Sequence, residues 1–137
     1  MRLDPCALPD AAQEFLTERH LATLSTTRWN GELHVVPVGF TFDRDTATAR
    51  VITSSDSVKA RNAGRQGATA ALCSVDRARW ITLSGPIRVE TSADAVADAE
   101  RRYTERYRPP RINPKRVVLI MDVTVISASS QLGRRSR

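Results

Sequence analysis

The sequence predicts a mainly β fold, a six-stranded antiparallel split β-barrel with two or three short flanking helices. Three observations predict it. Strand-like segments alternate with tight turns, Asn30-Gly31 marks a hairpin, and Gly85-Pro86 interrupts the longest strand where a barrel strand would bend. The 137 residues fit one domain, 1–137, whose modest core favours self-association to bury more surface.

The first half of the chain reads as a helix followed by three strands. Apolar residues recur at helical spacing over 9–19 and predict an amphipathic helix. A turn at 43–46 separates the second strand from the third, so we expect the three strands to form an antiparallel meander. The predicted strands cover residues 21–27, 33–42 and 49–53.

The second half reads as a short helix around Lys59, three strands and a further helix. The last strand is almost continuously apolar, which predicts a central place in the sheet. The polar and basic tail, 131–137, is expected to be disordered. The predicted strands cover residues 68–75, 79–90 and 117–126, and the helix covers 93–107.

Charge and composition narrow the class of partner. A net charge of +6 favours an anionic partner, namely nucleic acid, an acidic coenzyme or a dicarboxylate substrate. Only 5% of residues are aromatic and no stacking motif is visible, which argues against nucleic acid. Without a membrane-length apolar run or a signal-like N-terminus, we expect a cytoplasmic protein with no membrane partner. Cys6 and Cys73 lack metal-ligand spacing and are expected to stay reduced.

No catalytic or metal-binding set is visible in the sequence. His20 and His34 lie in or beside predicted strands, where a single histidine usually makes structural hydrogen bonds. Neither a Ser/His/Asp set nor a metal-spaced cluster nor a glycine-rich nucleotide motif is present. A catalytic role therefore requires a bound cofactor, which the protein would orient and complement in charge.

The clearest binding pattern lies in 51–72, where a strand leads through a hydroxyl-rich turn into a short helix. Hydroxyl groups and the free N–H groups of a helix start suit a phosphate, and Lys59 adds a compact positive charge. The alternative is an ordinary capped helix with Lys59 in solvent, and the residues alone leave both open. The candidate phosphate ligands are Thr53, Ser54, Ser55, Ser57 and Lys59.

Pro37 interrupts the second predicted strand, because proline has no N–H for the strand ladder. A cofactor ring placed against Pro37, Val38 and Gly39 would use this gap. The alternative is an ordinary edge-strand proline, which the residues alone favour.

The segment 103–111 combines two tyrosines, three arginines and a Pro-Pro pair. It fits either a lid that neutralises an acidic ligand or a solvated helix end followed by a rigid linker. We take the helix end as the default interpretation.

These patterns together resemble the split-barrel flavin-binding family that includes the pyridoxamine phosphate oxidases, and particularly its deazaflavin-dependent branch. The resemblance spans about residues 11–127 and is greatest to the small deazaflavin-dependent biliverdin reductases. It implies that the hydroxyl-rich turn and its lysine hold the phosphate of a flavin or deazaflavin coenzyme. The residues that carry it are Pro37, Val38, Thr53, Ser54, Ser55, Lys59, Asn62, Trp80 and Gly85.

The resemblance also implies a function. A hydride would pass from reduced coenzyme F-420, a deazaflavin, to an unsaturated tetrapyrrole such as biliverdin, giving bilirubin. The protein would be a homodimer in which Trp80 of one copy lies near the ring held by the other. The alternatives are an FMN-binding pyridoxamine phosphate oxidase, for which the chain is short, and a non-catalytic module that binds haem or flavin.

Overall fold

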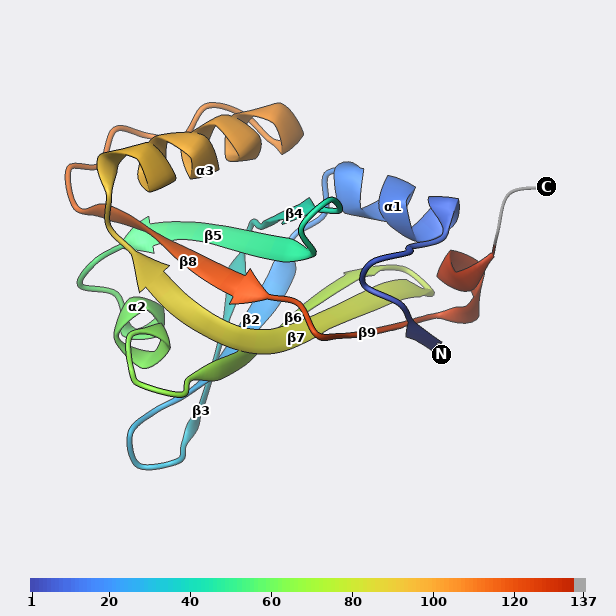
Figure 1. Cartoon of the computed structure of the whole chain (residues 1–137), viewed down its shortest axis with the longest axis horizontal. Coiled ribbons are helices and arrows are strands. Elements are labelled where there is room, and N and C mark those ends of the chain that lie inside the picture. The colour runs from blue at the N-terminus through green and yellow to red at the C-terminus, as the bar shows by residue number, and fades with distance from the viewer. Residues whose placement is uncertain (135–137) are drawn as a thin grey trace.

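A computed structural model of the chain describes residues 1–134. Within these residues the fold consists of nine strands, three α-helices and one 3-10 helix (Figure 1). The strands are β1 (Arg2–Leu3), β2 (Ala22–Thr27), β3 (Leu33–Val38), β4 (Thr41–Asp43), β5 (Thr48–Ser54), β6 (Thr69–Asp76), β7 (Arg79–Glu90), β8 (Arg116–Asp122) and β9 (Val125–Ala128). The helices are α1 (Asp10–Thr17), α2 (Val58–Ala63), α3 (Ala93–Arg106) and the 3-10 helix η1 (Ser130–Gly133).

The strands form one antiparallel sheet in the order β3-β2-β6-β7-β8-β5-β4, with β9 paired to β7 and β1 to β9. The sheet is not closed, since β3 and β4 are its two edges. The predicted class, a mainly β antiparallel split barrel with flanking helices, is confirmed. The predicted central place of the strand that starts near residue 117 is also confirmed, because β8 lies between β7 and β5.

The long strand β7 joins the two halves of the sheet. Its first part pairs with β6 and β9, and its last part, from Ile87 to Glu90, pairs with β8. The change of partner occurs at Gly85-Pro86, the bend expected from the sequence, and Figure 1 shows β7 curving along the sheet there. A Cβ atom on Gly85 would lie 1.9 Å from the carbonyl oxygen of Asp122, so only glycine allows this approach.

The predicted count of six strands is wrong because two predicted strands are each divided and β1 was not anticipated. The predicted strand 33–42 is divided at Gly39 and Phe40, so the first strands form two separate hairpins rather than one meander. At this break the Phe40 N–H donates to the Tyr107 hydroxyl, 3.1 Å away, instead of to a neighbouring strand. The predicted strand 117–126 is divided at Val123 and Thr124.

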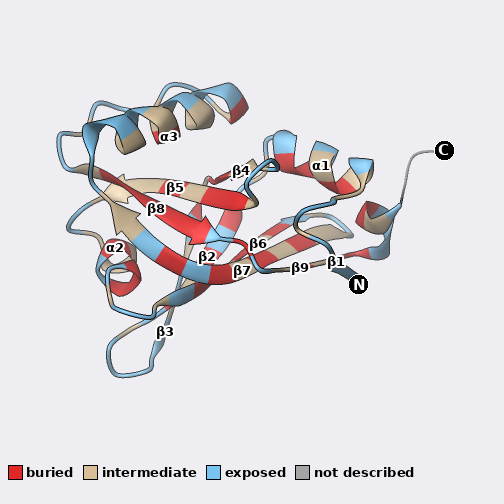
Figure 2. Ribbon diagram, viewed as in Figure 1, coloured by how far each residue is buried: buried red, intermediate tan, exposed pale blue. Residues whose placement is uncertain are grey.

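The helices cover the outside of the barrel, and the core lies between its strands (Figures 1 and 2). Phe15 and Leu16 bury the inner face of α1 in this core. Ala60 and Ala63 do the same for α2, whereas α3 packs mainly on β5 and β8 through Ala99. Figure 2 shows that buried residues fill the middle of β8 and alternate with less buried ones along β7, and that the tip of the β2–β3 hairpin is exposed.

The predicted disordered tail differs from the structure over its first residues. Gln131, Leu132 and Gly133 belong to η1, and Leu132 is buried because η1 packs against α1. Arg134 follows η1 as its C-cap, and the last part of the predicted tail, 135–137, lies outside the described residues. None of the helices in residues 1–134 has both the length and the apolar character needed to cross a membrane.

Candidate functional site

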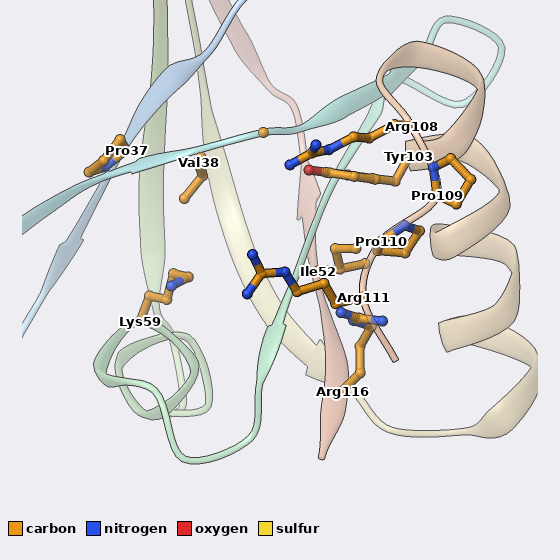
Figure 3. A pocket seen from close by; sticks show the side chains of 11 residues that line it. Pro37, Val38, Ile52, Lys59, Tyr103, Arg108, Pro109, Pro110, Arg111 and Arg116 are labelled. Atoms are coloured by element: carbon orange, nitrogen blue, oxygen red, sulfur yellow. The ribbon is translucent and has the colours of Figure 1, made fainter. Parts of the chain in front are cut away.

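The main cavity has a volume of about 550 Å³ and lies where the end of β3 faces α2, α3 and the segment 107–115 (Figure 3). Its floor includes Ile52 of β5. This volume is typical of a small-molecule site. The lining residues are Pro37, Val38, Gly39, Ile52, Lys59, Tyr103, Arg108, Pro109, Pro110, Arg111 and Arg116.

The cavity is strongly cationic. Lys59 is half-buried, and within residues 1–134 it forms no ion pair; its burial lowers the pKa of its ammonium group. Arg108 and Arg111 likewise form no ion pair within that range, whereas Arg116 is bound to Glu100 at 2.8 Å. Three cations therefore face this space without a carboxylate partner from the described chain, and an anionic ligand would complement them.

His34 adds no positive charge to this region at neutral pH. Burial, followed by the nearby charges of Arg28 and Lys59, lowers the pKa of its imidazole from the ordinary value of 6.5. The imidazole is therefore neutral at pH 7. The positive charge of this region comes from the lysine and arginine side chains that line the cavity.

The wall formed by Pro37, Val38 and Gly39 is held in place by the end of α3. A Cβ atom on Gly39 would lie 3.2 Å from ring atoms of both Tyr103 and Tyr107. The Tyr107 hydroxyl accepts from the Phe40 N–H and lies 2.9 Å from the Phe40 carbonyl oxygen. The absence of a side chain at Gly39 thus leaves room for two aromatic rings, which lie far along the chain and are not a local feature of the sequence around Gly39.

The hydroxyl-rich turn lies beside the cavity, but its side chains bond mainly to one another. Thr53 donates to the Ser57 hydroxyl at 3.0 Å, and the same Ser57 oxygen caps α2 by accepting from the Ala60 N–H. The Ser54 hydroxyl accepts from Asn113 at 2.7 Å, and Ser55 is exposed. None of these four hydroxyl residues lines the cavity, so their contact with a phosphate stays a prediction.

Asn62 and Trp80 are also absent from the cavity lining. Asn62 is buried, and its amide donates to the Thr26 hydroxyl at 3.0 Å, which fixes α2 onto β2. Trp80 lies at the start of β7, where its backbone exchanges hydrogen bonds with Ser129. The structure thus brings together four of the predicted site residues: Pro37, Val38, Gly39 and Lys59.

The opposite wall of the cavity was not predicted from the sequence. Tyr103, Arg108, Arg111 and Arg116 line it, although the segment 103–111 was interpreted by default as a solvated helix end. The signal that points to this wall is the Arg-Pro-Pro-Arg sequence at 108–111, in which two cations flank a rigid pair.

The chemistry of the lining is that of a binding site. No group of three or more His, Cys, Asp or Glu side chains suited to a metal ion occurs in residues 1–134. The lining offers cations, one phenol and apolar surfaces, and it contains no serine, cysteine or histidine nucleophile. Such a lining is complementary to an anionic, partly apolar molecule that brings its own reactivity.

Comparison with known proteins identifies the family to which this chain belongs. The sequence profile described as Pyridoxamine 5'-phosphate oxidase matches residues 8–130. The chain belongs to this family. The match spans β2 to β9 and therefore every residue that lines the cavity. The sequence-based resemblance to this family is confirmed.

A relative within the pyridoxamine 5'-phosphate oxidase family is much closer in sequence. The chain is 52% identical over 125 residues to a Mycobacterium tuberculosis (strain CDC 1551 / Oshkosh) biliverdin reductase that depends on reduced F-420. The alignment covers 91% of this chain and 90% of that protein. The predicted likeness to the deazaflavin-dependent branch is confirmed.

Two solved structures show the same fold. One is a crystal structure titled as a pyridoxamine 5'-phosphate oxidase from Listeria innocua, with a TM-score of 0.69 and 12% identity, covering 87% of this chain and 95% of that one. The other is titled F-420 reductase, with a TM-score of 0.70 and 20% identity, covering 88% and 98%. These structures support the family's fold for this chain.

Proposed function

We propose that this protein is an oxidoreductase that uses reduced coenzyme F-420 to reduce an unsaturated tetrapyrrole such as biliverdin, giving bilirubin. The observation that carries the proposal is the 52% identity, over nine-tenths of both chains, to a biliverdin reductase that depends on reduced F-420. At such identity over the whole domain, a cavity of the same family is expected to keep its ligand class.

The cavity fits this coenzyme in charge and in size. F-420 carries a phosphodiester, and the cavity presents Lys59, which has no acidic partner in the described chain. Its volume of about 550 Å³ lies within the range of cofactor sites. The wall at Pro37, Val38 and Gly39 is uncharged, so a ring system could lie against it, and Pro37 offers no N–H there.

The coenzyme, when bound, supplies the hydride. The residues of this chain supply orientation and charge. Lys59 binds an anionic group on one side, and Pro37 to Gly39 support the ring on a wall that α3 fixes through Tyr107. Thr53, Ser54, Ser55 and Ser57 stay candidate phosphate ligands, because their turn precedes α2 and Lys59 directly.

We further propose that the protein is a homodimer that pairs through one face of the sheet that is nearly free of charge. Direct strand pairs such as Ser25 with Val35, and Val75 with Trp80, place these side chains on the same face. Arg2 of β1, which pairs with Ser127 at the margin of this face, is its one charged residue within these strand pairs, although 26% of the chain is charged. The face consists of Arg2, Thr23, Ser25, Thr27, Leu33, Val35, Pro37, Thr69, Ala71, Cys73, Val75, Trp80, Thr82, Ser84, Pro86, Val125 and Ser127.

A second copy is the partner that best fits this face. Leu33 and Val35 are 76% and 55% exposed in the single chain, and apolar side chains gathered on one face favour a covering partner. Pro37 belongs both to the face and to the cavity lining, so a dimer formed here would place its interface beside the cavity. Trp80 lies on the same face, which supports the expectation that it approaches the ring held by the other copy.

The function is tested by mixing the purified protein anaerobically with reduced F-420 and biliverdin. We expect one bilirubin for each F-420 oxidised, and tighter binding of F-420 than of FMN in parallel titrations. Biliverdin that stays unreduced would contradict the proposal. Tight FMN binding together with oxidation of pyridoxamine 5'-phosphate would establish the alternative cofactor and reaction instead.

A further inference from the structure

We propose that Arg108 and Arg111 form a rigid arginine pair that binds two carboxylate groups of the acceptor and thereby selects dicarboxylate tetrapyrroles. The inference deepens the proposed function and rests on it, because the acceptor's chemistry is taken from that proposal. It assigns to the segment 107–115 a role separate from that of Lys59.

Both arginines of the pair face the cavity without a partner. They line it together with Pro109 and Pro110, and Figure 3 shows both side chains extending from the connecting segment toward the side where Lys59 lies. Neither guanidinium forms an ion pair or a hydrogen bond with any residue in 1–134. Their donors are therefore available to a ligand, unlike those of Arg116, which bonds to Glu100.

The backbone between the two arginines sets their direction and spacing. Each proline fixes its own φ and also keeps the preceding residue extended, so Arg108, Pro109 and Pro110 are all restricted. Chains restricted in this way adopt the polyproline II form, with three residues per turn and a rise of about 3.1 Å per residue. Arg108 and Arg111 are three residues apart, so they leave the backbone on the same side, about 9 Å apart.

Two cations at a fixed spacing suit a ligand whose two anionic groups also have a nearly fixed separation. A bilin such as biliverdin carries two propionate groups on neighbouring inner rings, so its carboxylates have a limited range of separations. The carboxylates of the F-420 tail lie on a flexible chain, which gains little from a preformed spacing. The phosphodiester of the coenzyme is a single anion, for which Lys59 across the cavity provides a single cation.

The test compares biliverdin with biliverdin dimethyl ester, in which both carboxylates are neutral. We expect the wild-type protein to bind the diester about 10-fold more weakly, because two partly exposed charge-assisted contacts are lost. Arg108→Gln/Arg111→Gln should weaken binding of the diacid about as much and leave the diester unchanged. Binding is measured by absorbance titration of the cofactor-free protein, and KM is measured with reduced F-420 at saturation.

Two control variants separate the arginine pair from general effects. Arg19→Gln/Arg77→Gln removes the same charge from exposed residues that do not line the cavity, and it should change diacid binding by less than about 2-fold. Pro109→Gly/Pro110→Gly keeps both charges but loosens their spacing, and it should weaken diacid binding about 3-fold. Unchanged thermal unfolding curves would verify that all variants are folded.

The outcomes distinguish this inference from the proposed function. If wild type reduces both bilins with equal affinity, the function stands and the arginine pair has no role in selection. If the double variant weakens F-420 binding but not diacid binding, the pair serves the coenzyme and the inference is overturned. If wild type reduces neither bilin, the proposed function fails, and the inference fails with it.

Discussion

The Arg106 guanidinium donates a hydrogen bond of 2.6 Å to the carbonyl oxygen of Phe40 and lies 4.7 Å from the centre of the Phe40 ring. A second donor of the same group reaches the Glu18 carbonyl oxygen at 2.9 Å. The end of α3 is thereby fixed to the chain between β3 and β4, immediately after the cavity wall at Gly39. One buried side chain links the helix that precedes the arginine pair to the opposite wall.

Arg106→Met is expected to lower the free energy of unfolding by about 2 kcal/mol, because two charge-assisted hydrogen bonds to buried carbonyl groups are lost. Burial lowers the pKa of Arg106 because it removes water from the charged guanidinium, and this desolvation cost offsets part of what the two hydrogen bonds contribute. Arg101→Met, on the exposed side of α3, is the control and should cost about 0.5 kcal/mol or less. Urea denaturation measures both, and equal losses would contradict the assignment.

Lys59→Ala is expected to weaken F-420 binding about 10-fold to 150-fold, which corresponds to about 1.5 to 3 kcal/mol for a charge-assisted contact. The difference from wild type should shrink as salt rises, because the contact is screened. Arg61→Ala removes a charge from the exposed side of the same helix and should leave affinity unchanged. Calorimetric titration at two salt concentrations measures this, and equal affinities for wild type and Lys59→Ala would remove Lys59 from the site.

Gly85→Ala is expected to destabilise the fold by about 3 kcal/mol, since the new methyl group would lie 1.9 Å from the Asp122 carbonyl oxygen and β7 would have to move. Gly64→Ala is the matched control, because residue 64 has right-handed helical backbone angles and its nearest contact is 3.3 Å. Thermal unfolding compares the two. A Gly85→Ala protein as stable as wild type would show that β7 bends elsewhere.

Asp98→Asn is expected to cost about 1 kcal/mol at pH 7, because Asp98 bonds to Arg102 at 3.0 Å and lies 3.8 Å from Arg50 of β5. Although burial opposes ionisation, hydrogen bonds from Arg102 and Arg101 keep the pKa of Asp98 below 3.8. A carboxyl group with a lowered folded-state pKa stabilises the fold above its unfolded pKa, and this contribution is lost as pH falls through the folded pKa.

The difference between wild type and Asp98→Asn should therefore shrink below pH 3.8. Urea denaturation at pH 7 and at pH 3 measures it. Asp122→Asn, whose partner Arg88 is exposed, should change stability by less than about 0.5 kcal/mol at pH 7. A difference that persists undiminished in acid would mean that Asp98 acts through packing rather than charge.

Val35→Arg is expected to weaken self-association at least about 100-fold, because an unpaired charge would be buried among the exposed apolar side chains of the pairing face. Light scattering over a concentration series measures the dimer. Thr104→Arg, on the exposed side of α3, is the control and should leave the dimer intact. A wild-type protein that is monomeric at high concentration, yet binds F-420 fully, would contradict the homodimer.

Local signals in the sequence were sufficient for much of the fold. The hairpin at Asn30-Gly31 and the bounds of β7 follow from turn chemistry and residue type, which act over a few positions. The division between β3 and β4 was not predictable in this way. It depends on Tyr107 and Arg106, which contact Phe40 from more than 60 residues away.

The candidate site likewise contains residues that local sequence signals predict and residues that they do not. The wall at Pro37 and the cation at Lys59 were predictable, because a missing N–H and a lysine after a polar turn are local features. The opposite wall was not predictable, because the sequence around Arg108 and Arg111 has the pattern of an exposed linker. Only the folded position of the end of α3 brings these two residues to the cavity.

The bend of β7 has a consequence for how the molecule opens. Because β7 pairs with β6 and β9 before the bend and with β8 after it, neither half of the barrel can separate without breaking bonds to this one strand. The backbone amides at its centre should therefore exchange with deuterated water only through global unfolding, and their protection reports the full stability of the protein. The exposed tip of the β2–β3 hairpin, in contrast, should exchange through local fraying at a much faster rate.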